Sequence, residues 1–510
     1  MLKSQLAITE SGQDSLQLNM TALIEVLFDW IESTNPGILS YGSVSFRHAL
    51  ECHYYFLAVN QPSSLLPLLE AASGWRKSTV KHPDTEALQE LFDDVSRKSQ
   101  GKYKHFSLRK MKAIRALLSL YKSKITSGTG TQTTKPPAAE RPIAYFGLNE
   151  RYVSFFSKII AMTGEQKSVF IPLGNAEARR VAELAKYAVA PDASDKVCLS
   201  NIKLSALHPL YIDYLTILNQ FLLAIGSLRA VNAGAVVFAE GTSVQDTVLA
   251  MAAKQLGVPT LRIQSGRAGV LHSAYRNMPF DTMLVWGQGM AERLKQYTPD
   301  ANYVLTGNPD IQPAAGAHEQ SVKSMFAAGS QLLTVFTQPI NPYLSSTDYD
   351  LMIQLVDQLL EQNQSLCVLV RKHPVDSCLG FEQIAPKHKS RLKISLSKDL
   401  DLQAVIHASD LVLGFYSTTL SESAAYGVPA VLMQLRAEHV VFPYPERYGA
   451  AIAVHDVRSA LDVIHKILHD AAYKLTLRQN MDKFADYFFG PRDGKAMTRI
   501  TENILQLALK

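Results

Sequence analysis

The sequence predicts an α/β protein in which two parallel-sheet domains follow a helical N-terminal module. Its 510 residues exceed what a single hydrophobic core normally holds. From residue 141 onward, short apolar runs suited to buried strands alternate with helix-period segments, as in a parallel sheet with helical crossovers. A Gly-, Ser-, Thr- and Pro-rich stretch precedes this part. We therefore expect a helical module at 1–125, a linker at 126–140, domains at 141–315 and 328–490, and a C-terminal helix at 491–510.

The first 125 residues show helical spacing of apolar side chains. The spacing recurs at 20–31, 45–59, 63–72, 85–96 and 107–124. A separate module and an N-terminal extension of the next domain both fit this pattern. The last of these helices is basic and amphipathic, which suits an anionic membrane surface, although a packed helix with a solvated outer face shows the same pattern.

Composition sets broad limits on partners and setting. With 47% hydrophobic and 19% charged residues, the chain is an ordinary globular protein. A net charge of +5 suits nucleotides or an anionic surface, and because no nucleic-acid motif occurs we expect no nucleic-acid partner. The four cysteines are scattered without metal-ligand spacing, which favours a reduced compartment. There is no signal-peptide core and no run of eighteen apolar residues, so we expect a cytoplasmic protein.

In the first α/β domain, one carboxylate follows a strand directly. We expect strands at 143–146, 168–171, 235–239, 260–263 and 280–286, and helices at 152–163, 211–231 and 243–256. No GxGxxG turn is present, so no NAD site is expected. Glu240 ends the third strand, and Gly241 frees the backbone so that the acid can face a cleft. Such a carboxylate suits a general base or a nucleophile, or it supports the loop.

A polar loop follows the strand at 260–263. It begins with Gln264, contains Arg267 and His272, and holds two glycines. A flexible loop of this composition suits a carboxylate or a phosphate. Gln264 and Arg267 are therefore candidate donor-binding residues.

In the second domain, polar residues lie at the ends of two strands, at 331–336 and 365–373. They are Thr337 and Gln338 after the first strand, and Arg371, Lys372, His373 and Pro374 at the end of the second. Because the first strand's end is expected to face the cleft as well, Thr337 and Gln338 are candidate donor-binding residues, as are Arg371, Lys372 and Pro374. Two cations and an imidazole at a strand's carboxyl end lie where open α/β sheets bind ligands, although a histidine there also occurs as a structural residue. Asp399 and Asp401 have the spacing of a metal-binding pair, but they precede a helix at 402–408 and fit an N-cap better, so no metal is expected.

A helix start between apolar runs at 411–413 and 430–433 is the centre of the predicted site. Ser417, Thr418 and Thr419 bring three hydroxyls to unpaired helix amides, which suits an anion such as phosphate. Glu422 lies one turn beyond Thr418, where it can face a ribose hydroxyl. A capped helix of any α/β domain is the alternative. After this stretch, the polar, proline-broken segment 436–448 suits a loop near the site.

Short motifs in this region resemble those of a known group of enzymes. His373-Pro374, Ser417-Thr418-Thr419 and Gly427-Val428-Pro429 are similar to the HP and serine/threonine motifs of bacterial sialyltransferases and of capsule or lipopolysaccharide Kdo transferases. The similarity covers roughly residues 230 to 435. It implies the GT-B fold, two Rossmann-like domains facing a cleft with a final helix that crosses back. It also implies a CMP-linked sugar donor whose phosphate these motifs hold. Because protein donors then meet the leaving group, we expect neither a divalent cation nor a cofactor.

The resemblance leaves the role of the carboxylate open. Sialyltransferases carry two acids before the glycine, whereas here Ala239 precedes Glu240. In retaining Kdo transferases a carboxylate attacks the anomeric carbon instead, and Glu240 matches it by position. His373, with Arg371 or Lys372, is expected to stabilise the departing phosphate.

The resemblance implies a glycosyltransferase of bacterial surface-polysaccharide synthesis. We expect it to transfer Kdo or a nonulosonic, sialic-like acid to a surface glycan or a glycosylated or protein acceptor, with the helix at 107–124 as its candidate contact with the inner membrane. The Gly307-Asn308-Pro309 turn also resembles non-hydrolysing UDP-sugar 2-epimerases, which are the alternative. A non-catalytic binding protein of the same fold is the third candidate.

Overall fold

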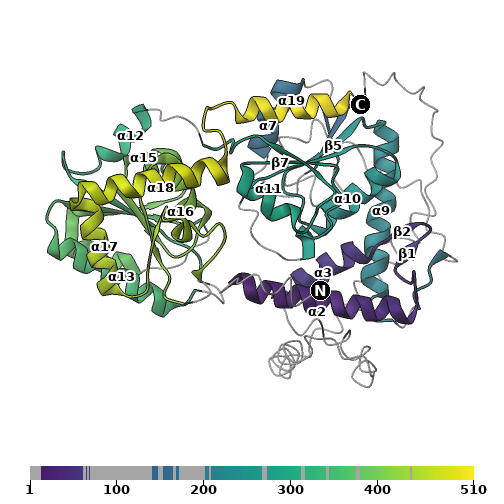
Figure 1. The fold of residues 1–510 in the computed structure, drawn as a ribbon, viewed down its shortest axis with the longest axis horizontal. Coiled ribbons are helices and arrows are strands. Elements are labelled where there is room, and N and C mark those ends of the chain that lie inside the picture. The colour runs from purple at the N-terminus through teal and green to yellow at the C-terminus, as the bar shows by residue number, and fades with distance from the viewer. Residues whose placement is uncertain are drawn as a thin grey trace.

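The computed structural model shows an elongated protein with two α/β halves (Figure 1). It describes residues 13–60, 65, 68, 141–146, 153–164, 168–171, 201–205, 208–266, 273–311, 316–340, 344–374, 380–436 and 439–509. The expected helices at 85–96 and 107–124, nearly all of the one at 63–72, the linker at 126–140 and the loop residues Arg267 and His272 lie outside this part.

Two six-stranded sheets, each with all strands parallel, form the frame of the molecule. The first has the order β4 (Ser168–Phe170), β3 (Ile143–Phe146), β5 (Ala235–Phe238), β6 (Thr260–Ile263), β7 (Thr282–Val285) and β8 (Asn302–Leu305). The second has the order β11 (Leu392–Leu396), β10 (Leu366–Lys372), β9 (Gln331–Phe336), β12 (Leu411–Gly414), β13 (Ala430–Met433) and β14 (Ile452–Val454). The predicted fold class, two Rossmann-like domains of GT-B type, is confirmed.

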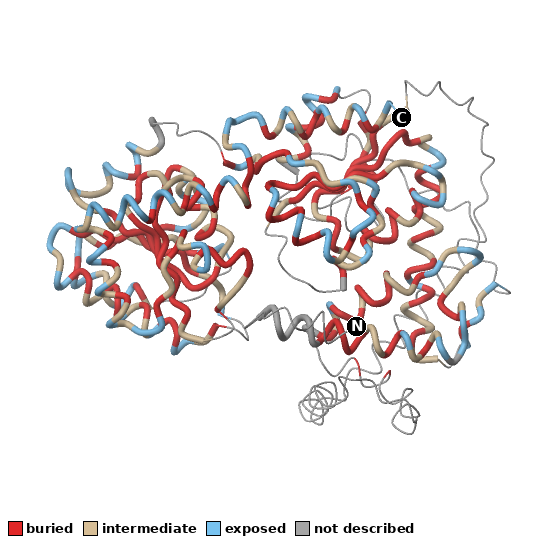
Figure 2. The backbone as a smooth tube through the Cα atoms, viewed as in Figure 1, coloured by how far each residue is buried: buried red, intermediate tan, exposed pale blue. Residues whose placement is uncertain are grey.

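Helices cover both sheets, and the sheets themselves are the most buried part of each half (Figure 2). In the first half they are α7 (Val153–Thr163), α9 (Tyr211–Val231), α10 (Val244–Gln255) and α11 (Gln288–Lys295), with a 3-10 turn η9 (Ser273–Tyr275). In the second half they are α12 (Gly316–Lys323), α13 (Ser346–Gln362), α14 (Gly380–His388), α15 (Leu402–Ala408), α16 (Thr418–Glu422), α17 (Val457–His469) and α18 (Ala471–Phe489), with 3-10 turns η10 (Lys389–Arg391), η11 (Ser423–Tyr426) and η13 (Pro445–Tyr448).

Some elements begin or end away from their predicted limits for local reasons. Helix α13 starts at Ser346, because Ser345 and Asp348 form a capping box. Strand β10 ends at Lys372, because the amide of His373 donates to the side chain of Thr337, in the loop after β9. The helix expected from 45 begins at Arg47, as Val44–Ser45 is strand β2. Asp401 caps α15 by accepting from the amide of Ala404, as predicted.

The two N-terminal helices pack on the first sheet's helices. Helix α2 (Gln13–Thr34) and helix α3 (Arg47–Asn60) flank a short hairpin of β1 (Ser40–Tyr41) and β2 (Val44–Ser45), and α3 contacts α9, α10 and η9. Among the helices that the structure describes, α9 is the one whose length and hydropathy match a membrane span. In the most apolar 18 residues of α9, 61% are buried inside the protein. A core helix of a globular domain can have the same length and hydropathy.

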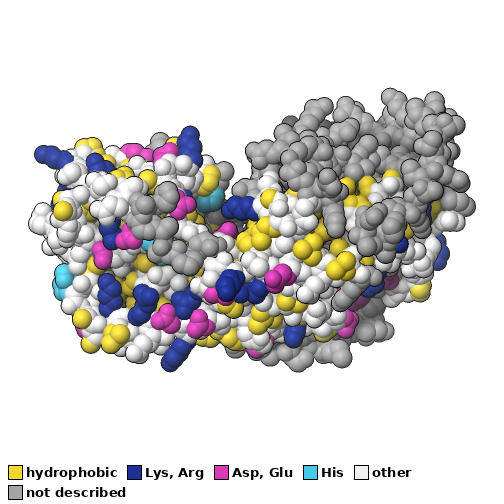
Figure 3. Space-filling view, turned by 90° about the horizontal axis from the view of Figure 1, so that it is seen from above, with side chains coloured by type: hydrophobic (Ala, Val, Ile, Leu, Met, Phe, Trp, Pro, Cys, Tyr) yellow, Lys and Arg dark blue, Asp and Glu magenta, His cyan; other side chains and the backbone are white. Residues whose placement is uncertain are grey.

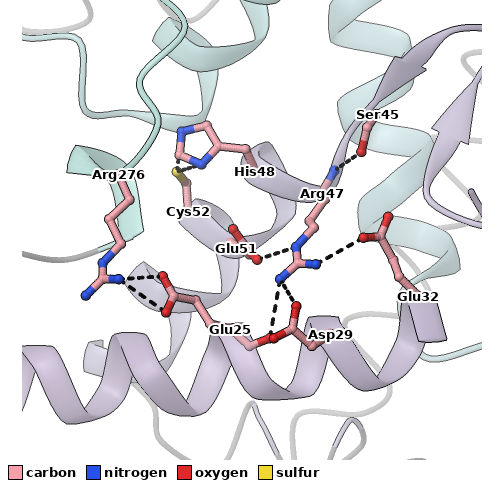
Figure 4. Close-up of polar contacts among 9 residues, drawn as sticks. All are labelled: Glu25, Asp29, Glu32, Ser45, Arg47, His48, Glu51, Cys52 and Arg276. Carbon is pink, nitrogen blue, oxygen red and sulfur yellow. Dashed lines mark hydrogen bonds and ion pairs between the residues drawn. The ribbon is translucent and has the colours of Figure 1, made fainter. Parts of the chain in front are cut away.

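Arg47 is the centre of a polar network that joins these helices (Figure 4). Its guanidinium lies 2.7 Å from Glu51, 2.6 Å from Asp29 and 3.1 Å from Glu32. Arg276, next to η9, pairs with Glu25 of α2 at 3.0 Å and so ties α2 to the first α/β domain. Burial, only partly offset by Arg47, raises the pKa of Glu51 to about 7.

The chain returns to the first domain at its end. After α18, Gly490 has a positive φ of +70°, and α19 (Ala496–Ala508) packs on α7, β5 and β6 (Figure 1). A Cβ on Gly287 would lie 2.5 Å from the carbonyl oxygen of Tyr487, and one on Gly289 2.6 Å from the Phe488 ring. The glycines that open α11 are therefore required by the close approach of α18.

Candidate active site

The carboxyl ends of three adjacent strands bring the predicted motif residues to one edge of the second sheet. Strand β9 lies between β10 and β12, with Phe336 opposite Arg371 and Val335 opposite Leu413. The segments that follow these strands therefore lie side by side. They carry Thr337 and Gln338, His373 and Pro374, and Ser417 to Thr419.

Thr337 and Gln338 bond to both neighbouring loops. The amide of His373 donates to Thr337 Oγ1 over 3.0 Å, and the amide of Tyr416 donates to Gln338 Oε1 over 3.0 Å. Tyr349 from α13 holds the backbone of Gln338 through its hydroxyl. We expected Thr337 and Gln338 to touch the donor, and the structure gives them the further task of fixing the two motif loops against each other.

The hydroxyl cluster stands at a tight strand-to-helix turn. Ser417 caps α16, and its Oγ accepts from the amide of Thr419 over 3.2 Å. Ser417, Thr418 and Thr419 are all partly exposed. A Cβ on Gly414 would lie 2.9 Å from Leu420 and 3.0 Å from the Phe336 carbonyl, so the turn requires glycine there. Partly exposed hydroxyls at the same sheet edge as the exposed His373 can receive an anionic group.

Arg371 and Lys372 have other partners. The Arg371 guanidinium donates to the carbonyls of Ser397 and Leu400 over 2.6 and 2.9 Å, and burial lowers its pKa. Lys372 Nζ lies 3.1 Å from the carboxylate of Glu382 in α14. These contacts lie on the side of β10 that faces β11, away from β12. His373 thus shares a sheet edge with the hydroxyl cluster, whereas both cations have partners on the β11 side.

Glu422 contacts the first domain. Its carboxylate lies 3.5 Å from the side-chain amide of Asn308, in the loop after β8. Burial raises the pKa of Glu422 to about 7, and the nearby charge of Asp310 adds to this effect. The carbonyl of Asp310 accepts from the hydroxyl of Tyr426 over 3.0 Å and also from the side chain of Gln403. In this structure Glu422 contacts the first domain through Asn308, and its contact with a ribose hydroxyl stays a prediction.

Glu240 lies at the carboxyl edge of the first sheet, as the strand pattern predicts. It follows β5 and is partly exposed, and Gly241 has a φ of +73°. Ser243 and Asp246 then form a capping box at the start of α10. Burial raises the pKa of Asp246 to about 6, and the negative charge of Glu240 contributes to this rise. Two carboxylates, one exposed and one buried, therefore share this turn.

Gln264 is almost fully buried, and both ends of its side-chain amide are bonded within the protein. Its Oε1 accepts from the amide of Trp286 over 3.0 Å, and its Nε2 donates to the carbonyl of Gly266 over 2.8 Å. This bond also ends β7 at Val285, one residue before the predicted limit at Trp286. In this structure Gln264 orients the loop, and the companion residue Arg267 lies outside the described part.

Two groups near these loops were missed by sequence reasoning. Arg262 is a buried arginine inside the apolar strand β6, and that unusual placement was its only signal. The second group follows β13, where Arg436 pairs with Asp348 of α13 at 2.6 Å beside the buried His439. Burial opposes ionisation of Asp348, but bonds from Ser345 and the charge of Arg436 lower its pKa overall. Asp348 resembles a simple helix cap in the sequence, so its partner far along the chain was not foreseen.

The fold and the strand-end residues together define a GT-B-type α/β protein with polar loops at both sheets. No family model matches the sequence, and no curated protein sequence matches it. Solved structures of similar shape include a UDP-GlcNAc 2-epimerase from Neisseria meningitidis bound to UDP-GlcNAc, at 12% identity and a TM-score of 0.46, over 71% of this chain and 99% of that one. MurG from Acinetobacter baumannii is 13% identical with a TM-score of 0.47, over 72% and 99%. The wall teichoic acid polymerase TagF is 10% identical with a TM-score of 0.46, over 79% and 98%. At these values the neighbours assign no activity, and the fold rests on the strand orders described above.

Proposed function

We propose that the protein is a metal-independent glycosyltransferase that moves Kdo or a nonulosonic acid from a CMP-linked donor to a surface glycan or another acceptor. The observation that carries this proposal is the bonding of Thr337 to His373 and of Gln338 to Tyr416, which holds the HP and serine/threonine motifs at one sheet edge. The choice of CMP and of a sugar acid rests on the resemblance of those motifs. In this proposal residues 328–490 bind the donor and residues 141–315 bind the acceptor.

Each named side chain has a defined role in the proposed transfer. The hydroxyls of Ser417 to Thr419 bind the donor phosphate, and His373 donates a hydrogen bond to it as negative charge develops. The bond between the anomeric carbon and the phosphate oxygen breaks, and CMP leaves with the electron pair. Glu240 either takes the proton of the acceptor hydroxyl as that oxygen attacks, or attacks first and forms a glycosyl ester that the acceptor then displaces.

A sugar-nucleotide 2-epimerase is the second candidate, because the Gly307-Asn308-Pro309 turn lies against Glu422 where the domains meet. An epimerase needs no acceptor and must move a proton on the sugar. Near the first sheet's edge the described residues offer Glu240 and Asp246 for this purpose.

A nucleotide-release assay separates the candidates. The purified protein is incubated with CMP-, UDP- and GDP-linked sugars, with and without glycan acceptors. Acceptor-dependent release of CMP supports the proposal. Acceptor-independent isomerisation of a UDP-sugar supports the epimerase, and nucleotide-sugar binding without turnover supports a binding protein.

We also propose that the protein acts at the cytoplasmic face of the inner membrane through residues 107–124. On the face shown in Figure 3, basic and acidic side chains are interspersed over the second domain, so that part offers no uniformly basic surface. Sedimentation with anionic vesicles, comparing the full chain with a variant whose lysines at 110, 112 and 122 are replaced by glutamine, tests this attachment.

A further inference from the structure

Arg262 is a buried arginine at the carboxyl edge of the first sheet. It lies in β6, opposite Phe238 of β5 and Met283 of β7, and only 2% of its surface is exposed. A charged side chain in such surroundings is costly unless specific partners hold it. A buried strand position would be more stable with an aliphatic residue, so the presence of arginine calls for a reason.

The partners of Arg262 are a carbonyl and a ring. Its Nε donates to the backbone carbonyl of Glu240 over 2.5 Å, and its guanidinium lies 5.4 Å from the centre of the Tyr275 ring. Among the described residues no carboxylate lies within ion-pair distance of it, although its charge partly offsets the rise in the pKa of the buried Asp246, and its Nη1 has no hydrogen-bond partner. This is not the pattern of an arginine that stabilises a fold through a buried salt bridge.

The fit between Arg262 and the turn after β5 is close. A Cβ on Gly241 would lie 2.7 Å from Arg262 Cδ and 2.9 Å from its Nε, and 2.9 Å from the Phe280 ring. Gly241 also has a φ of +73°, which disfavours any other residue. The glycine and the arginine therefore form one unit, in which the guanidinium occupies the space that a side chain would need.

The bond from Arg262 to the backbone carbonyl of Glu240 bears on the direction of the Glu240 side chain. A backbone carbonyl held at 2.5 Å restricts rotation of the adjoining peptide, and with it the direction in which the Glu240 Cβ leaves the strand end. Glu240 is partly exposed and lies in a short turn that faces solvent. Without this bond, the direction of its carboxylate would be less restricted.

We propose that Arg262 is the positioning residue for Glu240, fixing its carboxylate for reaction through the backbone carbonyl and not by contact with substrate. The inference rests on the proposed function of Glu240. It predicts that changes at residue 262 lower kcat while leaving donor binding in the second domain intact, because the donor loops lie on the other sheet.

The test compares Arg262→Lys and Arg262→Met with Arg276→Met. Arg276 is a suitable control because it also lies over a tyrosine ring, that of Tyr297 at 5.2 Å, and also lies in the first domain, but pairs with Glu25 of α2. We expect kcat to fall about 10- to 100-fold in both residue-262 variants, since a misplaced catalytic group costs rates of this order. The Kd for CMP should stay within about twofold, and R276M should keep its kcat even if its Tm falls.

The outcomes separate this inference from the proposed function. If E240Q is inactive while R262K and R262M match R276M in kcat, Arg262 has no positioning role and only this inference is wrong. If E240Q is fully active, or the wild type transfers no sugar, the proposed function is wrong and the inference falls with it. If R262M does not fold, the kcat of R262K tests the inference. If R262K does not fold either, the role of Arg262 is structural and the inference is wrong.

Discussion

The carboxylate of Glu422 lies 3.5 Å from the side-chain amide of Asn308, and the two residues follow strands of different sheets. In the sequence, both residues lie in polar segments that follow predicted strands. Burial, with the charge of Asp310 close by, raises the pKa of Glu422 to about 7. The ionised form of Glu422 is therefore disfavoured where the two domains touch.

This contact predicts a specific pH dependence of stability. A carboxyl whose folded pKa lies above its usual value of 4.5 stabilises the fold fully below pH 4.5, and that contribution is lost as the pH rises through about 7. Glu422→Gln removes the ionisation but keeps an amide beside Asn308. Relative to wild type, we expect E422Q to gain on the order of 1 to 3 kcal/mol in unfolding free energy between pH 4.5 and pH 8.

Urea unfolding at several pH values measures this difference. Glu361→Gln is the control, because that carboxylate is half exposed on α13 and pairs with Lys387 on the surface. A difference between E422Q and wild type that stays constant across pH would show that Glu422 does not titrate in this window.

Removing the imidazole of His373 is expected to abolish turnover without unfolding the protein. His373 is exposed, so His373→Ala should change the Tm by only about 1 to 2 °C. Loss of a donor to the departing phosphate should lower kcat by about 100-fold or more. His465→Ala, at an exposed histidine of α17, is the matched control and should keep full activity. A large fall in Tm for H373A alone would indicate a structural histidine instead.

The carboxamide variant of Glu240 should separate binding from transfer. Glu240 stands at the first sheet and the proposed nucleotide site at the second, so Glu240→Gln should bind CMP as tightly as wild type. Transfer should fall by about 100-fold or more, since the variant can neither accept a proton nor attack carbon. Isothermal calorimetry and the release assay measure the two quantities, and normal turnover would remove Glu240 from the mechanism.

The bond between Thr337 and the His373 amide should matter for donor affinity. Thr337→Val leaves that amide without its acceptor, which costs about 1 to 3 kcal/mol, while Thr337→Ser keeps the hydroxyl. We expect T337V to weaken CMP binding by about tenfold and T337S to bind nearly as wild type. Equal affinities in the two variants would mean that the bond does not align the HP loop.

The glycines at the start of α11 predict that added side-chain volume there disturbs the packing of α18 against this helix. Gly287→Ala places a methyl group 2.5 Å from the Tyr487 carbonyl, where only backbone can move, so stability should fall by about 1 to 3 kcal/mol. Gly266→Ala is the control, because among the described residues no atom beyond its chain neighbours lies within 4 Å of the added carbon. Calorimetric unfolding compares the two, and equal Tm values would show that α18 has room to shift.

Much of the fold follows from local patterns. The strands at 260–263, 331–336 and 430–433 and the helices at 211–231 and 402–408 have the predicted limits, because apolar periodicity and capping residues act between neighbours in the sequence. Parallel pairing then brings successive carboxyl ends to one edge, so residues such as His373 and Ser417 share that edge. This much the amino-acid order determines by itself.

Only the tertiary structure decided what the longer side chains contact. Arg371 and Lys372 were expected beside the hydroxyls, but they bond to a loop after β11 and to α14. Glu422 contacts Asn308, 114 residues away, and Arg262 bonds to the turn after β5. A flexible charged side chain takes the partner that packing places within its reach, and this partner comes from a distant segment that no local pattern specifies.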